Sequence, residues 1–447
     1  MFAKPIARVE ALVKGTLFDC QMCGQCVLSQ TGLVCPMTCP KGLRNGPCGG
    51  TLHGECEVYP DRPCVWVKIH RRTVGEQSLE RPNLLPSCDA RLQNTSSYLN
   101  LLSGADKVGR TPLEYLDLGV KRTTLPIQTQ SKLEQRLKNG AFVRTCELRA
   151  PRGADFKRFE EQASHARDRF DAVNATAYLS ARPSLPSAVV AAKLAELGIE
   201  AVCQSTCRDH TKTTFIAELL QNQLNGVHNT LCLTGDSYNG VTKIKQVFDM
   251  DGAIMLYEAR YLREKGVIYF TGERVANAPR PFLGAAINPF TEPANVPIRR
   301  LKQKAAAGAD FIQTQLIFDM QAFDEWFMSL VRQEGIHEEL FILAGVPVVT
   351  SRKALEVLPR IPGACIPADA MRRLSEAADC EAEGVQLARE LVEQAAKIPG
   401  VSGVHLMLFG PDHSVLPAVI ETLESTSNQQ PAKVSFRADN AAETPAT

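Results

Sequence analysis

Short runs of apolar, β-prone residues alternate with amphipathic helical patterns through residues 141–424, and this alternation limits the fold more than any other feature. Apolar strands separated by helices are typical of a parallel sheet that is covered by helices. Eight such units in about this length predict an α/β fold, a (β/α)8 TIM barrel. The eight predicted strands are Phe142–Leu148, Ala172–Thr176, Ala201–Ser205, Thr230–Thr234, Phe282–Ile287, Phe311–Gln315, Phe341–Ala344 and Val404–Phe409. A doubly wound open sheet is the alternative, although no G-x-G-x-x-G follows any of these runs.

Polar residues stand at the ends of several predicted strands, where the catalytic groups of TIM barrels are found. Glu147 lies at the end of the first strand and Asp236 follows the fourth. Two carboxylates that face each other across a barrel mouth are suited to acid–base chemistry. His405, which precedes apolar residues, is expected to be a packed strand-end histidine.

The charge balance excludes some partners. The chain carries 50 Lys and Arg against 49 Asp and Glu, so attraction to nucleic acid or to an anionic membrane surface is not expected. No apolar run reaches the roughly 18 residues that a membrane span requires. The first residues, M-F-A-K-P, lack the pattern of a secretory signal, which indicates a cytoplasmic protein.

Cysteines are concentrated near the N-terminus, and eight of the fifteen lie between residues 20 and 64. A C-x2-C-x2-C spacing lets one stretch of backbone present three thiolates to a single metal centre. Isolated histidines argue against a Cys2His2 finger, and the lack of an export signal argues against disulfides. The predicted metal ligands are Cys20, Cys23, Cys26, Cys35, Cys39, Cys48, Cys56 and Cys64, enough for two four-cysteine sites. Most other cysteines, such as Cys146, Cys203 and Cys232, are expected to be buried apolar residues.

Composition divides the chain into four stretches. Residues 1–67 form the cysteine-rich module, residues 68–140 a polar connector with short helices, and residues 141–424 the barrel. Residues 425–447 contain few large apolar side chains and are predicted to be a disordered tail.

Six segments in chain order carry a resemblance to a known family. They are R-T-C-E-L at 144–148, D-A-V-N-A-T at 171–176, Q-S-T-C-R-D at 204–209, L-C-L-T-G-D at 231–236, K-A-A-A-G-A-D-F-I-Q-T-Q at 304–315 and G-V-H-L-M at 403–407. Residues 141–424 thereby resemble methylenetetrahydrofolate reductase, a flavin-dependent barrel. The resemblance implies reduction of 5,10-methylenetetrahydrofolate to 5-methyltetrahydrofolate, in one-carbon metabolism and methionine supply.

The same resemblance assigns roles to single residues. Glu147 is placed as the general acid for the folate N10, Asp236 as a carboxylate near both flavin and folate, and Gln315 as the amide that recognises the pterin. The positions that correspond to flavin contacts are Thr176, Gln204, Thr234, Gly235, Asp236, Phe248, Asn288 and Lys304.

The cysteine-rich segment, with C-P-K-G-L-R-N-G-P-C-G-G at 39–50, resembles the accessory module that accompanies this reductase in some bacteria. That module is associated with iron–sulfur clusters or described as zinc-binding. A 4Fe–4S cluster is favoured over zinc here, because a flavin enzyme can use a one-electron relay and zinc has no redox chemistry. The expected partners are a folate, an electron donor, either NAD(P)H or an electron-transfer protein, and further copies of the chain.

Several positions depart from the common bacterial pattern. Gln204 stands where that pattern has His, and Thr234-Gly235-Asp236 replaces R-G-D. The predicted loop at 347–353 carries Arg352 where an aromatic is common. These changes leave open whether the flavin is FAD or FMN and whether NADH stacks on it. A folate-binding carrier with a zinc head and no flavin is the main alternative, and a methyltransferase acting on C1 units is a third.

Overall fold

Eight parallel strands close into a barrel in the computed structural model, which describes residues 3–51, 53–75, 79–114, 129–179, 182–238 and 244–426. The strands are β1 (Val143–Leu148), β2 (Ala172–Ala175), β3 (Ala201–Thr206), β4 (Asn229–Leu233), β5 (Phe282–Ile287), β6 (Phe311–Leu316), β7 (Phe341–Val349) and β8 (Val401–Phe409). Each pairs with its neighbour in sequence, and β1 pairs with β8 through Val143 and Gly403. The predicted TIM barrel is confirmed, and closure excludes the open sheet.

Strand β7 is longer than predicted. The sequence predicts that this strand ends at Ala344 and that residues 347–353 form a loop, and the loop prediction is wrong for residues 347–349. Pro347 lies opposite Met407, and the pairing with β8 continues to Val349. Proline lacks an N–H, but burial of the following valines and the long partner strand keep this segment extended.

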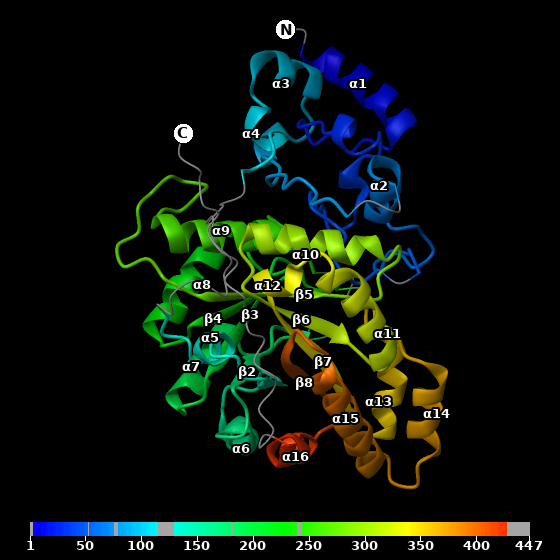
Figure 1. Ribbon diagram of the computed structural model, residues 1–447. Coiled ribbons are helices and arrows are strands. Elements are labelled where there is room, and N and C mark those ends of the chain that lie inside the picture. The colour runs from blue at the N-terminus through cyan, green and yellow to red at the C-terminus, as the bar shows by residue number, and fades with distance from the viewer. Residues whose placement is uncertain are drawn as a thin grey trace, which may run out of the picture.

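Helices follow the strands and cover the outside of the barrel (Figure 1). They are α6 (Lys157–Ala166), α7 (Ser187–Glu196), α8 (Lys212–Leu224), α9 (Gly252–Lys265), α10 (Asn295–Ala307), α11 (Met320–Trp326), α12 (Ile336–Glu339), α13 (Arg352–Val357), α14 (Ala368–Glu376), α15 (Cys380–Lys397) and α16 (Leu416–Thr426). Their apolar faces and the outward-facing strand residues form one continuous core. The predicted tail begins inside α16, and residues 427–447 lie outside the described part of the chain.

A separate apolar layer fills the barrel at the N-terminal ends of its strands. Phe282 and Phe311 stack there with ring centroids 5.1 Å apart. Leu133 and Leu137 of α5 (Lys132–Lys138), which precedes β1, belong to the same cluster. Side chains therefore close this end of the barrel, so the opposite end is the one available to a ligand.

The N-terminal segment forms a small head that lies beside α9 and α10 (Figure 1). Its helices are α1 (Ala3–Phe18), α2 (Val65–Thr73), α3 (Ser97–Ser103) and α4 (Lys107–Arg110). The core of the head consists of few apolar side chains, including Leu43, Trp66 and Ile69. No helix in the described ranges has the length and apolar character needed to cross a bilayer.

Candidate functional site

Glu147 lies near the C-terminal end of β1, in register with Asn174 of β2. Its side chain hydrogen-bonds that of Gln204, which comes from β3. Burial raises the pKa of the Glu147 carboxyl, while Arg149 and the Gln204 hydrogen bond oppose the rise. A carboxyl of this kind holds a proton at higher pH than an exposed one, as a general acid must.

Asp236 follows β4 in a tight turn. Gly235 has φ +85°, and a Cβ on it would lie 2.9 Å from the Cβ of Arg208, so this turn requires glycine. Asp236 itself is exposed to solvent. Its pKa is nevertheless raised, first because surrounding protein desolvates it and then because Glu57 repels it, against the attraction of Lys41. Glu57 and Lys41 belong to the head, so the head reaches the barrel mouth.

Two further contacts fasten the head over the same end of the barrel. The backbone N–H and the Nδ2 of Asn45 donate to Oδ2 of Asp251, over 2.9 and 2.8 Å. Asn288, at the end of β5, donates from Nδ2 to the carbonyl of Gly49 at 3.3 Å and to that of Gly363 at 2.7 Å. The Asn288 amide, which is predicted to contact flavin, therefore hydrogen-bonds the head and a barrel loop.

Lys304 lies in a small pocket at the edge of the mouth. The pocket is lined by Asn288, Thr291, Arg300 and Lys304 of the barrel and by Cys48 of the head, among others. Burial and the nearby Arg300 lower the pKa of Lys304 to about 7. The hydroxyl of Thr291 is buried and has no hydrogen-bond partner. Two basic side chains and an unused hydroxyl fit an anionic group such as a cofactor phosphate.

The remaining predicted flavin contacts lie at the same barrel end. Thr176 Oγ1 accepts from the Ala150 N–H at 3.2 Å, and Gln204 Oε1 accepts from Ala177 at 3.4 Å. The carbonyl of Thr234 accepts from the Arg208 N–H at 3.1 Å. Phe248, with φ +42°, lies 5.9 Å from the Lys41 ammonium. The structure thus gathers these residues from the end of β2, from β3 and from the segment between β4 and α9.

Gln315, predicted to bind the pterin, is engaged by the protein. Its Nε2 donates to the Pro362 carbonyl at 2.9 Å, and its Oε1 accepts from the Leu316 N–H at 3.0 Å. Recognition of a ligand edge by this amide therefore requires these bonds to be shared or exchanged.

Buried polar residues inside the barrel satisfy one another. Asn174 donates to Gln313 Oε1 at 2.8 Å, and Thr145 Oγ1 lies 2.9 Å from His405 Nδ1. Burial lowers the pKa of His405 to about 3, so the ring is neutral. His405 is a packed histidine, as the sequence predicted.

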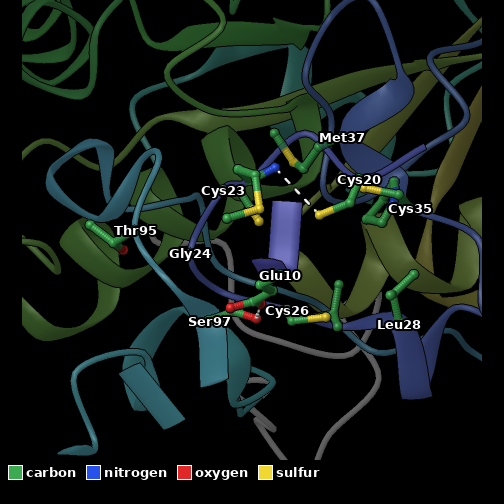
Figure 2. Close-up of a pocket in the computed structure, with 13 residues that line it drawn as sticks. Glu10, Cys20, Cys23, Gly24, Cys26, Leu28, Cys35, Met37, Thr95 and Ser97 are labelled. Carbon is green, nitrogen blue, oxygen red and sulfur yellow. Dashed lines mark hydrogen bonds between the residues drawn. The ribbon is translucent and has the colours of Figure 1, made fainter. Parts of the chain in front are cut away.

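Four of the predicted ligand cysteines surround one pocket in the head. Figure 2 shows Cys20, Cys23, Cys26 and Cys35 around it, close to α1 and α3. The thiol of Cys20 hydrogen-bonds Cys35, which lowers the pKa of Cys35 and raises that of Cys20.

The other four cysteines lie toward the barrel. Burial raises the pKa values of Cys39, Cys48 and Cys64, and the charges of neighbouring cysteines, Cys56 among them, add to the rise. Within the described residues, no three His, Cys, Asp or Glu side chains are assembled as a metal site. The structure brings the thiols into two neighbourhoods without arranging them as ligands.

Cys88, which lies in the predicted polar connector, is not among the predicted metal ligands. The Cys88 thiol donates to Cys23 and lowers the pKa of Cys23 to about 6. Arg44 Nη1 lies 3.3 Å from the same sulfur. Cys88 is 24 residues beyond the last cysteine of the cluster, so spacing alone gave no signal for it.

The protein is a TIM barrel with carboxylates at the ends of β1 and β4, an arrangement suited to acid–base catalysis on a ligand bound at the C-terminal end of the strands. Comparison with known sequences is more specific. Residues 132–423 match the family described as methylenetetrahydrofolate reductase, and residues 2–89 match one described as methylene-tetrahydrofolate reductase C terminal. The chain belongs to the methylenetetrahydrofolate reductase family.

Individual relatives are distant. Methylenetetrahydrofolate reductase (NADH) 1 of Arabidopsis thaliana is 30% identical over 230 residues, which cover 48% of this chain and 37% of the plant protein. Methylenetetrahydrofolate reductase 2 of Schizosaccharomyces pombe is 29% identical over 182 residues, covering 40% and 28% of the two chains. The matches therefore span well under half the length of these relatives. A solved Clostridium thermocellum protein that binds 5-methyl-5,6,7,8-tetrahydrofolic acid has a TM-score of 0.49 and 14% identity, covering 66% of this chain and all of that one.

Proposed function

We propose that this protein reduces 5,10-methylenetetrahydrofolate to 5-methyltetrahydrofolate, using electrons that pass through a bound flavin. The observation that carries the proposal is the position of the Glu147 carboxyl, beside Gln204 near the C-terminal end of β1, in the barrel that matches the reductase family. Asp236, which follows β4, supplies the second carboxylate that the chemistry needs.

Each carboxylate has a separate task in this mechanism. The imidazolidine ring of the substrate opens when Glu147 gives its proton to N10, which leaves a cationic iminium at the methylene carbon. Asp236 stabilises that cation by its charge. A bound, reduced flavin would supply the hydride that the iminium carbon needs to become a methyl group. Gln204, hydrogen-bonded to Glu147, orients the acid.

The pocket beside Lys304 supports a phosphate-bearing cofactor. Lys304, Arg300 and the unpartnered Thr291 hydroxyl would hold the phosphate. The same donors suit FMN and FAD.

We further propose that the head carries 4Fe–4S clusters, with structural zinc as the alternative. The division of the eight cysteines into two groups of four supports this. The apolar core of the head is also small, so the head requires an additional source of stability, which a bound metal would provide. Such clusters would relay single electrons from an electron-transfer protein to the flavin, whereas NAD(P)H, the alternative donor, would give its hydride to the flavin directly.

Anaerobic purification followed by absorption spectroscopy and metal analysis tests both proposals. We expect flavin absorption near about 450 nm with a broad iron–sulfur shoulder, and bleached flavin that regains its colour on addition of 5,10-methylenetetrahydrofolate. Protein that binds folate and zinc but no flavin would instead support the carrier alternative.

The rate of the folate half-reaction should depend on pH through Glu147. Because the acid must be protonated and burial raises its pKa, the rate is high at low pH and falls as pH rises through that pKa. Above it we expect a loss of about tenfold per pH unit, measured by rapid mixing of reduced enzyme with substrate. A rate that rises with pH over this limb would contradict the role.

A further inference from the structure

Lys41 and Glu57 of the head form a buried ion pair at the barrel mouth. Their side chains are each only 3% exposed. Taking two charges out of water is unfavourable unless each finds further polar partners. Here those partners belong to the loop after β4.

Both members of the pair hydrogen-bond the backbone of the residues on either side of Asp236. Lys41 Nζ donates to the Gly235 carbonyl at 2.7 Å. The N–H of Ser237 donates to Glu57 Oε1 at 3.2 Å. The loop is thus held on both sides of the carboxylate, while Asp236 itself stays exposed.

The barrel holds the other side of this loop. Arg208 Nη1 donates to the Asp236 carbonyl at 3.3 Å, and its guanidinium lies 4.5 Å from the Tyr238 ring centroid. Glu57 Oε2 also accepts from the Cys48 thiol at 3.6 Å, which connects the ion pair to the cysteine group nearest the barrel.

We infer that the Lys41–Glu57 pair positions Asp236, so that the reaction centre is completed by the head and is not built by the barrel alone. The inference rests on the proposed function and assigns positioning residues to it. Lys41 fixes the backbone before Asp236 and Glu57 the backbone after it, which sets the direction of the carboxylate. Without the pair, the glycine at 235 gives the loop freedom to turn the carboxylate away from the substrate.

A double-mutant cycle on the full-length protein separates positioning from a general loss of structure. We expect Lys41→Met to slow flavin reoxidation by 5,10-methylenetetrahydrofolate about tenfold in the wild-type background, but less than about twofold in an Asp236→Asn background. Lys41→Arg should restore most of the rate, because it keeps the charge and a donor. Lys68→Met, which removes an exposed lysine of α2, is the control and should leave the rate unchanged.

Equal losses in both backgrounds would overturn the inference, since a merely structural lysine acts independently of Asp236. Amide hydrogen exchange at residues 234–238 gives a readout without turnover. We expect exchange to accelerate at least about tenfold in Lys41→Met and to stay unchanged in Lys68→Met. If the wild-type flavin is not reoxidised by the folate, the proposed function fails, and the exchange result alone decides whether the head holds this loop.

Discussion

Glu147→Gln should slow the folate half-reaction by about 100-fold or more, within the range that general acid catalysis contributes. Glutamine keeps the size of the side chain and can still hydrogen-bond Gln204, but it has no proton to give to N10. The measurement is rapid mixing of photoreduced enzyme with 5,10-methylenetetrahydrofolate under anaerobic conditions. The pH dependence of this step should disappear in the same variant.

Glu196→Gln is a matched control, because Glu196 is exposed at the end of α7 and, among the contacts described, pairs only with Lys193 of the same helix. It should react like the wild type. Flavin content and the affinity for 5-methyltetrahydrofolate should be similar in all three proteins. A Glu147→Gln enzyme that retains a rate within about threefold of the wild type would show that the proton comes from elsewhere.

Asp251→Ala should destabilise the protein by about 3 kcal/mol, because it leaves several buried donors without an acceptor. Asp251 caps α9 by accepting from Ala253 and Ile254, both at 3.1 Å, and it also accepts both donors of Asn45 from the head. The substitution therefore weakens a helix and the attachment of the head together. Denaturant unfolding measures the loss, and hydrogen exchange at residues 41–57 should accelerate.

Asp379→Ala separates the two effects. Asp379 caps α15 by accepting from Glu381 at 3.0 Å and Ala382 at 3.1 Å, but it is exposed. Loss of such a cap should cost about 1 kcal/mol. Equal losses for Asp251→Ala and Asp379→Ala would mean that the bonds to Asn45 contribute nothing to stability.

The barrel could be predicted because its signal is local. Strands buried on both faces require apolar, β-prone runs, and helices between them require an apolar stripe, so each unit is visible in its own residues. The register between β1 and β2 then brings Glu147 to the end where ligands bind. The main error is the predicted end of β7, which lies too early in the chain. Pro347 indicates a break in the strand, but pairing with the long strand β8 continues through it.

The hydrogen-bond partners of the predicted site residues could not be inferred from local sequence. The sequence predicts ligand contacts for Asn288 and Gln315, yet their amides donate to the carbonyls of Gly49, Gly363 and Pro362. Amide side chains accept any correctly placed partner, so sequence indicates the kind of bond and not the partner. Cys88 was missed for the same reason, since its proximity to Cys23 depends on the path of the connector.

By itself, the sequence determined a closed α/β barrel, two carboxylates at its strand ends and a head rich in thiols, because periodicity, strand order and composition act over short stretches of chain. Only the tertiary structure decided that Lys41 and Glu57 lie against the residues on either side of Asp236. These side chains are separated from Asp236 by about 180 residues or more. A buried charge is stable only where the fold supplies polar partners, and which partners those are depends on how the head docks on the barrel.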